Sequence, residues 1–291
     1  PIFPTVFGHG TLESMMEDMK ASGAVMIAAF EGWNDACQAA TDVVRHLVAK
    51  YESREVRHIR CGEYYDYQAT RPIVCYATGR RRIVWPQTTF YDITLRPGLH
   101  VYAQIAPEPN YRWIEYCRQS LRIADELDVT RLITLGSMFA DCPHTRDLPL
   151  EVDDGSGHID PDQRYSGPAG IPTVLDTIAA DEGLDTATMW VSIPQYLGSD
   201  GCAQATMQML GGLSDLLGVD LDPGDLPAKS EQWKAKASVL TRCNDALAEY
   251  VRHLEQDYDR NAKVRRETSH GGPECEQLIR EAEAYLKSMG D

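Results

Sequence analysis

The stretch Ala24-Val25-Met26-Ile27-Ala28-Ala29-Phe30 decides the fold of this chain. An uninterrupted apolar run of this length is typical of a strand covered on both faces, and it is far short of the roughly 20 residues that cross a bilayer. The turn Glu31-Gly32-Trp33 follows it, and Asn34 and Asp35 are residue types that begin helices well. Apolar residues then recur at helical spacing. Residues 24–51 therefore predict a strand, a loop and a helix.

Two further buried strands are predicted at 131–135 and 187–193, and helical patterns separate the three strands along the chain. This alternation favours parallel pairing, because the chain needs the length of a helix to return to the same edge of a sheet. Residues 55–106 contain short β-like segments instead, and 140–170, rich in Asp, Gly and Pro, is predicted to be mostly loop. The predicted fold class is α/β, with a three-layer α/β/α sandwich as the core.

The chain divides by composition into a core domain, 1–222, and a C-terminal helical subdomain, 223–291. Within the core, a β-hairpin insertion is predicted at about 78–97. In the subdomain, apolar residues step by four and three from 233 to 258 and predict a helix. After a loop, a second helix opening at Pro273 would complete a C-terminal helical hairpin.

The chain is strongly acidic, with 28 Lys and Arg against 44 Asp and Glu and a formal net charge of -16. Phosphate backbones and anionic lipid surfaces are bound largely by cationic side chains. Local exceptions are Arg80-Arg81-Arg82, interpreted as a solvated hairpin tip, and the basic residues at 263–266. We therefore expect no nucleic-acid partner and no membrane partner.

The eight cysteines are scattered and contain no C-x-x-C pair, the close spacing that a zinc ribbon or a redox dithiol needs. Most have apolar neighbours, as expected for buried thiols in a reducing compartment, so we expect a cytoplasmic protein. The chain has no P-loop, G-x-S-x-G, H-E-x-x-H or G-x-G-x-x-G motif in the right context. We therefore predict neither a metal site nor a cofactor.

A candidate ligand site is predicted where the loops after the three buried strands meet. In open α/β sheets, ligands bind beyond the carboxyl ends of the strands. Arginine there could pair with a carboxylate or phosphate, and aspartate or histidine could move a proton. The candidate residues come from the three loops and, with Arg71, from the β region: Glu31, Trp33, Asn34, Asp35, Arg71, Gly136, Ser137, Asp141, His144, Thr145, Arg146 and Gln195.

A purely structural role is the alternative for each of these side chains. Asn34 and Asp35 lie where helix caps lie, and His144 could hold loop carbonyl groups. Arg71 and Arg146 could bridge acidic side chains in so acidic a chain. Convergence of Asp35, His144 and Arg146 in a closed pocket would favour chemistry, whereas a backbone cap or a surface ion pair for each would count against it.

Five segments of the chain resemble one known family. They are 29–36 (A-F-E-G-W-N-D-A), 64–72 (Y-Y-D-Y-Q-A-T-R-P), 135–146 (L-G-S-M-F-A-D-C-P-H-T-R), 165–171 (Y-S-G-P-A-G-I) and 190–196 (W-V-S-I-P-Q-Y). On these motifs the chain, from about 22 to 260, resembles the bacterial, long-chain branch of the proteasome assembly chaperone family. It departs from the family pattern at Gln195, where histidine is common, and at Ser166, where an acidic residue is expected.

The resemblance implies a core like that of purine nucleoside phosphorylases and bacterial peptidyl-tRNA hydrolases. It also implies a hairpin used in self-association, a helical C-terminal part over a cavity, and often a homotrimer. Three functions stay open: a homo-oligomeric assembly factor that binds protein partners, a phosphorylase- or hydrolase-like enzyme acting on a small polar substrate such as a nucleoside or peptide, and a small-molecule binder without turnover.

Overall fold

The computed structural model describes residues 23–60, 62–155 and 166–269. Four parallel strands form the centre of the main sheet, and each pairs with its neighbours in the order given next. These four strands are β6 (Leu99–Pro107), β1 (Ala24–Glu31), β7 (Val129–Ala140) and β9 (Asp185–Pro194). The predicted buried strands are thus confirmed as β1, β7 and β9.

Antiparallel strands flank this parallel centre on both sides. They are β5 (Thr88–Arg96) and β2 (Glu52–Ile59) beside β6, and β8 (Leu150–Asp153) beside β9. Within the described residues the main sheet has seven strands in the order β2-β5-β6-β1-β7-β9-β8. The stretch predicted as mostly loop therefore contains one short strand, β8, whose exposed and acidic residues give little apolar signal.

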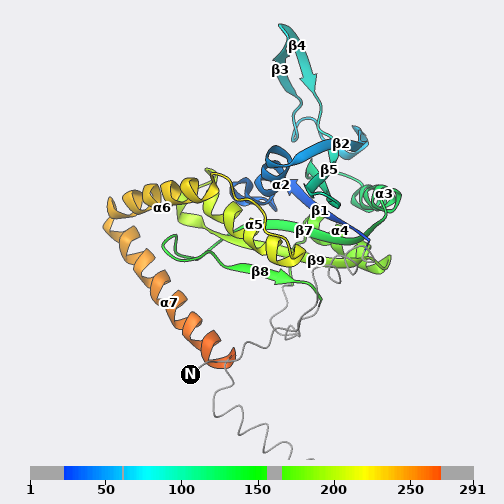
Figure 1. The fold of residues 1–291 in the computed structure, drawn as a ribbon. Coiled ribbons are helices and arrows are strands. Elements are labelled where there is room, and N and C mark those ends of the chain that lie inside the picture. Colours follow the sequence, from blue (N-terminus) through cyan, green and yellow to red (C-terminus); the bar gives the residue numbers. More distant parts are fainter. Residues whose placement is uncertain (1–22, 61, 156–165, 270–291) are drawn as a thin grey trace, which may run out of the picture.

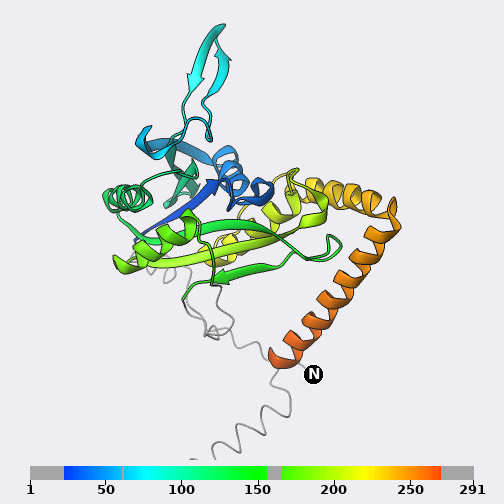
Figure 2. The same ribbon diagram turned by 180° about the vertical axis from the view of Figure 1, so that it is seen from behind.

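Two helices cover each face of the main sheet (Figures 1 and 2), as the three-layer prediction requires. One face packs against α2 (Ala39–Lys50) and α5 (Ala203–Leu217), and the other against α3 (Trp113–Glu126) and α4 (Ile171–Asp181). Side chains of β1 alternate between the two apolar layers, with Ile27 in the first and Met26 and Phe30 in the second. Since both faces are buried, β1 is apolar along its whole core length.

The β-hairpin insertion lies earlier in the chain than predicted. It consists of β3 (Ile73–Ala77) and β4 (Arg80–Val84), which pair only with each other and project from the body (Figure 1). Thr78 and Gly79 both have positive φ, as a two-residue hairpin turn requires. The predicted range 78–97 was wrong because it included β5, which has the same β-like composition but lies in the main sheet.

The C-terminal part forms two helices where one had been predicted over 233–258. α6 (Leu226–Arg242) packs on α5, and α7 (Asp245–Ser269) leaves it at a bend (Figures 1 and 2). Asn244 makes this break, because its side-chain oxygen accepts the Leu247 amide hydrogen at 3.1 Å, as an N-cap does. The second helix predicted from Pro273 lies outside the described residues. Three short 3-10 helices complete the described elements: η1 (Ala36–Gln38), η2 (Gly62–Tyr64) and η4 (Gln195–Leu197).

Candidate functional site

The carboxylate of Asp35, in the loop after β1, is used to start helix α2. Its Oδ1 accepts the backbone amide hydrogens of Ala40 at 2.9 Å and Thr41 at 3.2 Å, and its Oδ2 accepts the Thr41 hydroxyl. Gln38, at the formal N-cap position, has φ of 59° and no side-chain cap bond, so Asp35 takes over the capping role. Burial raises the pKa of Asp35, while these hydrogen bonds oppose the shift.

Asn34 ties the β1 loop to the start of α4. Its Nδ2 donates to Glu108 Oε1 at 2.7 Å, and the same oxygen accepts the Ile171 amide hydrogen at 3.0 Å. Gly170 leaves no space beside this pair, since a Cβ there would lie 1.8 Å from Asn34 Oδ1. The fully buried Asn34 side chain therefore belongs to the packing between elements.

Ser137 lies inside β7, and its polar groups are bonded to the β1 loop. Its amide donates to the Asn34 carbonyl at 2.8 Å, and its hydroxyl donates to the Ala36 carbonyl at 2.9 Å. Gly136 before it is covered by the Trp190 ring, since a Cβ there would lie 2.6 Å from ring carbons. A hydroxyl buried against a backbone carbonyl is not placed to act as a nucleophile.

His144 is buried, with only 1% of its surface exposed, and both ring nitrogens face hydroxyl groups. Nδ1 lies 2.8 Å from the Tyr196 hydroxyl oxygen, which also accepts the His144 amide hydrogen, and Nε2 lies 3.1 Å from Ser238 Oγ. Burial lowers the pKa of His144, and the nearby Glu255 partly opposes this. The neutral ring therefore joins the loop after β7 to η4 and α6.

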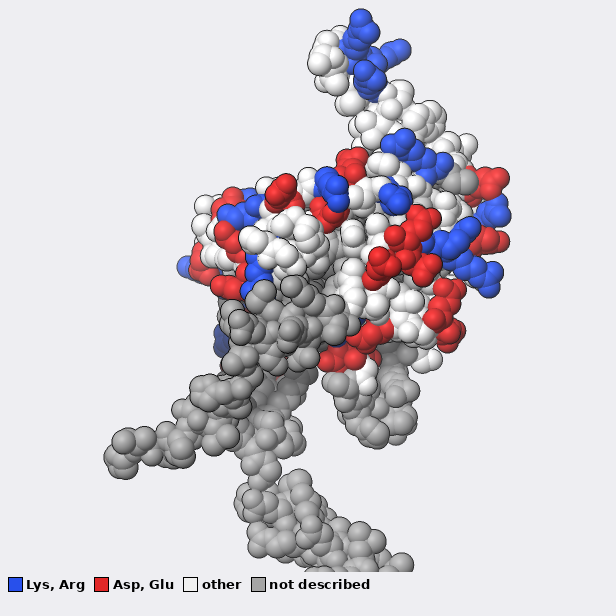
Figure 3. Space-filling model, turned by 45° about the vertical axis from the view of Figure 1, so that its right-hand side comes forward, with Lys and Arg blue, Asp and Glu red and all other residues white. Residues whose placement is uncertain are grey.

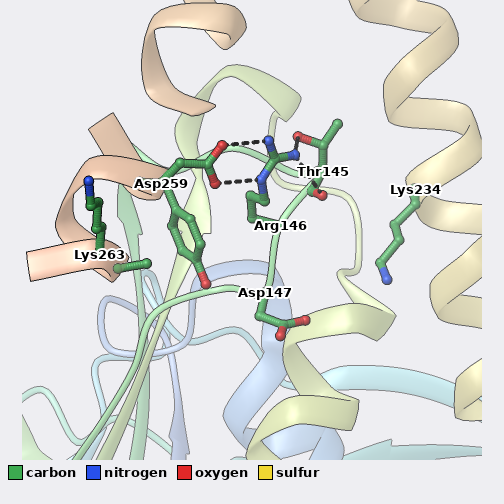
Figure 4. A pocket seen from close by; sticks show the side chains of 8 residues that line it. Thr145, Arg146, Asp147, Lys234, Asp259 and Lys263 are labelled. Atoms are coloured by element: carbon green, nitrogen blue, oxygen red, sulfur yellow. Dashed lines mark hydrogen bonds and ion pairs between the residues drawn. The ribbon is translucent and has the colours of Figure 1, made fainter. Parts of the chain in front are cut away.

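Thr145 and Arg146 contact helix α7 (Figure 4). Arg146 forms a two-pronged ion pair with Asp259, with Nε–Oδ1 and Nη2–Oδ2 distances both 2.9 Å. Its third nitrogen, Nη1, lies 3.6 Å from Glu255 Oε1, which also accepts the Thr145 hydroxyl. The Arg146 side chain thus clamps the loop to α7 in a geometry that lysine could not reproduce.

Asp141 and Gln195 form a second contact between the strand ends and α7. Asp141 Oδ1 accepts the Tyr250 hydroxyl at 2.5 Å and also an amide hydrogen of Gln195. Tyr196, beside Gln195, stacks edge-on against Tyr250 with ring centroids 5.8 Å apart. The loops after β7 and β9 therefore do meet, and the C-terminal helix covers them.

The remaining predicted residues lie apart from this cluster. Trp33 is 65% exposed, so it is not a packing residue beneath the loop. Glu31 forms an ion pair with Arg45 on α2. Arg71 is exposed and lies two residues before the β3–β4 hairpin begins. None of these three has a contact, among those described, with the loops after β7 and β9.

The predicted site is therefore divided into separate contact groups rather than one pocket. A cleft of about 560 Å³ between the 145–147 loop, α6 and α7 includes only Thr145 and Arg146 of the twelve candidates. The physical reason is that the carboxylate, amide and hydroxyl groups at the strand ends bond to backbone and to neighbouring elements. Asp35 is held by a helix start and Arg146 by an ion pair, which counts against a catalytic role for them.

Comparison with known proteins identifies the family. The family model described as the PAC2 family matches residues 29–241, well over half of the chain. The chain belongs to the PAC2 family. The proteasome-assembly chaperone homologue of Mycobacterium tuberculosis is 34% identical, with a TM-score of 0.71 over 78% of this chain and 99% of that one. A PAC2 family protein from Streptomyces avermitilis is 32% identical, with a TM-score of 0.70 over 78% and 99%.

More distant structures share the fold alone. The archaeal proteasome activator PbaB of Pyrococcus furiosus is 12% identical, with a TM-score of 0.59 over 75% of this PAC2 chain and 93% of its own. No curated protein matches the chain. Among the described residues, no helix of the PAC2 chain is long and apolar enough to cross a membrane.

Several side chains that shape this region of the PAC2 protein were not predicted. They are the partners of the predicted loops: Glu108, Tyr196, Ser238, Tyr250, Glu255 and Asp259. Two of them could have been found from the sequence, because Tyr196 ends one of the family-like motifs and Tyr250 borders the apolar stripe that predicted a helix. The acidic residues of α7 could not have been found in this way, because an ordinary solvated helix face has the same composition.

The described residues contain no group of three or more His, Cys, Asp or Glu side chains placed to hold a metal ion. Asp141, Cys142 and His144 are neighbours in sequence but have different partners, since Asp141 accepts from Tyr250 while His144 contacts Tyr196. Burial raises the pKa of Cys142 to about 12, which keeps this thiol protonated. The described cysteines of the PAC2 chain are free thiols.

Proposed function

We propose that this PAC2 protein is a homo-oligomeric assembly factor that binds proteins, and that its β3–β4 hairpin makes the subunit contacts. The exposed apolar side chains of the hairpin and its stem support this proposal most directly. They include Tyr76, 75% exposed, and Ile73, 66% exposed, together with Val74, Ile83, Val84 and Trp85. Contiguous apolar surface of this kind is typical of protein interaction sites.

Both faces of the hairpin carry apolar side chains. The register places Ile73 opposite Val84 on one face and Val74 opposite Ile83 on the other. An isolated two-stranded hairpin is marginally stable in water, and covering each such side chain fully contributes about 1.5–3 kcal/mol. The hairpin therefore gains most of its stability when another protein surface covers it.

A second copy of this chain is the partner that the charge distribution favours. Arg80, Arg81 and Arg82 follow the hairpin turn as the first three residues of β4, whereas the chain carries a net charge of -16. Figure 3 shows the basic tip standing apart from a body on which acidic patches are prominent. A basic tip of one copy resting on the acidic body of the next is complementary. Head-to-tail contacts form a closed ring where the rotation between copies allows it, and we propose a homotrimer.

Similar structures are the basis for proposing an additional protein partner. One is named as a proteasome-assembly chaperone homologue and another as an archaeal proteasome activator. By analogy, we propose that the oligomer acts in the assembly of a protein complex.

The contacts of the candidate catalytic groups favour this binding role over a phosphorylase- or hydrolase-like activity. Asp35 accepts helix amides, both nitrogens of His144 face hydroxyl groups, and Arg146 is paired with Asp259. A general base or a substrate clamp needs an unoccupied position within hydrogen-bond reach of the substrate.

Sedimentation velocity on hairpin variants tests the proposal. The parent chain should sediment as an oligomer, and the double variant Ile73→Ser, Tyr76→Ser as a monomer with an unchanged circular-dichroism spectrum. Val239→Ser is a matched control, because Val239 is 59% exposed on α6, outside the hairpin. A parent chain that is monomeric at every concentration, or a hairpin variant that stays oligomeric, would contradict the proposal.

A further inference from the structure

A second cleft, of about 500 Å³, lies at the stem of the β3–β4 hairpin. Its walls are mainly aromatic and aliphatic and come from the loop at 62–67 and from the end of β4 and the residues after it: Tyr67, Ile83, Val84, Trp85 and Pro86. The rings of Tyr67 and Trp85 meet edge to face, with centroids 4.9 Å apart, and Trp85 is still 53% exposed. Pockets of this kind at protein interfaces receive a large apolar side chain of the partner.

Two charged side chains border this stem cleft, and neither has an ion-pair partner within the described part of the chain. Arg60 lines the cleft and donates through Nε to Gln87 Oε1 at 2.9 Å, which leaves its other guanidinium hydrogens for a further acceptor. Asp66 lies in the loop that forms one wall, and one of its carboxylate oxygens accepts the Tyr111 hydroxyl at 3.2 Å. The cleft therefore offers an apolar interior, a donor and a negative charge.

The hairpin itself carries a side chain of matching chemistry. Tyr76 on β3 is 75% exposed, so it does not fill the cleft of its own chain. It pairs with Arg81, three residues beyond the Ile73–Val84 pair at the stem, which places it roughly 10 Å nearer the tip in extended chain. Since directly opposite residues lie on the same face of a hairpin, a surface that receives the Tyr76 ring also meets the Arg81 guanidinium.

We propose that Tyr76 of one copy of this chain occupies the stem cleft of the next copy. The phenol ring packs against Tyr67 and Trp85, and its hydroxyl oxygen accepts a hydrogen bond from Arg60. Tyrosine suits such a position because it brings a large rigid ring and one polar group at a low cost in conformational entropy. This contact rests on the proposed function, since it names the two surfaces that meet when the hairpin joins two subunits.

Charge complementarity favours a second copy as the occupant. Arg81 arrives on the same face as Tyr76, and Asp66 beside the cleft has no cation of its own among the described residues. Opposite charges beside an apolar contact fix its orientation and speed association. The tip of the hairpin stands clear of the body (Figure 1), so each copy offers its tip to one neighbour and its cleft to another. Such a contact is head-to-tail.

Sedimentation velocity on two single variants and on their mixture tests this contact. Tyr76→Ser removes the inserted side chain and leaves the cleft, whereas Trp85→Ser removes a wall of the cleft and leaves the tip. Each variant alone should dissociate at concentrations where the parent chain is oligomeric, with a dissociation constant raised at least about tenfold, as for an aromatic residue at the centre of an interface. Val239→Ser, on α6 and outside both surfaces, should sediment as the parent chain does.

The equimolar mixture of the two variants gives the sharper result. One intact tip then meets one intact cleft, so a one-to-one heterodimer should form, which also shows that both variants are folded. A single variant that stays as oligomeric as the parent chain, or a mixture that stays monomeric, would overturn the contact while an oligomeric parent chain leaves the proposed function standing. A parent chain that is monomeric at every concentration would contradict the proposed function and this contact together.

Discussion

Arg146 and Asp259 meet through two parallel contacts of 2.9 Å each, and this pair joins the loop after β7 to helix α7. Two further polar contacts join the same loop to α7, one between Asp141 and Tyr250 and one between Thr145 and Glu255. These hydrogen bonds and ion pairs lie at exposed positions, beside the buried Val251 and Leu254 of the same helix. Polar attachment at a solvated surface is weaker than apolar packing, so α7 should open more readily than the sheet.

The first prediction concerns this attachment. Asp259→Asn removes the charge that Arg146 pairs with, so the backbone amides of α7 should exchange with solvent several-fold faster than in the parent chain. Asp257→Asn is the control, because the ion pair that Asp257 forms within the described part of the chain is with Arg260, three residues away on the same helix. Hydrogen-exchange mass spectrometry measures both. Equal exchange in the two variants would show that the Arg146–Asp259 pair does not hold the helix.

The second prediction concerns pH. Burial lowers the pKa of His144 below its unfolded value of about 6.5, so the folded state resists protonation. The unfolded chain then binds more protons than the folded chain as the pH falls below about 6.5, and stability is lost over that window down to the folded pKa. Above about pH 6.5, the contribution of the neutral His144 ring to folding stability is fully present.

Urea unfolding at about pH 7 and about pH 5 measures this effect. His144→Gln should be less stable than the parent chain at the higher pH and lose less stability on acidification. His253→Gln, at an exposed position on α7, should keep the pH dependence of the parent chain. The account of His144 fails if both variants lose stability with pH as the parent chain does.

The third prediction concerns the start of α2. Asp35→Ala removes the oxygens that accept the Ala40 and Thr41 amide hydrogens, and should cost about 1–2 kcal/mol of stability. Asp35→Asn should cost less, since its side-chain oxygen can still accept one amide hydrogen. Asp42→Asn, at a half-buried position on the same helix, removes the ion pair with Arg45 and should cost less than about 1 kcal/mol. Denaturant midpoints give the three values, and a neutral Asp35→Ala would rule out the capping role.

The fourth prediction compares two glycines. Gly170→Ala would place a Cβ 1.8 Å from Asn34 Oδ1, inside the packed contact with Glu108, and should destabilise by about 2 kcal/mol or more. Gly211→Ala meets nothing within 4 Å on α5 and should stabilise by about 0.5–1 kcal/mol. Thermal unfolding of both variants tests the contrast. A tolerated Gly170→Ala would mean that the junction of Asn34, Glu108 and α4 is not tightly packed.

Much of the fold could be predicted from the sequence, because strands buried on both faces and helices with one apolar face have strong periodic signals. Composition alone did not predict two features of the fold, namely the position of the hairpin and the break between the two C-terminal helices. β5 has the same β-like composition as the projecting hairpin, and only the pairing of β5 with β2 and β6 distinguishes them. The apolar stripe of α6 and α7 continues across Asn244, so the helix break depends on one capping side chain.

The candidate site was harder to predict for a different reason. The sequence shows which loops follow the buried strands, and those after β7 and β9 do meet. It does not show which polar groups the fold itself occupies. Asp35, Asn34 and Ser137 each bond to a neighbouring element, and the partners of Arg146 lie more than a hundred residues away on α7. Those pairings depend on tertiary structure alone.

The central claim is that another copy of the chain covers the β3–β4 hairpin, and hydrogen exchange of its amides tests this most directly. The amides of residues 73–84 should exchange slowly at concentrations where the oligomer forms and rapidly after dilution below its dissociation constant. Those of β1, buried inside the chain, should stay protected at both concentrations. Exchange of the hairpin amides that is equally fast at every concentration would contradict the claim.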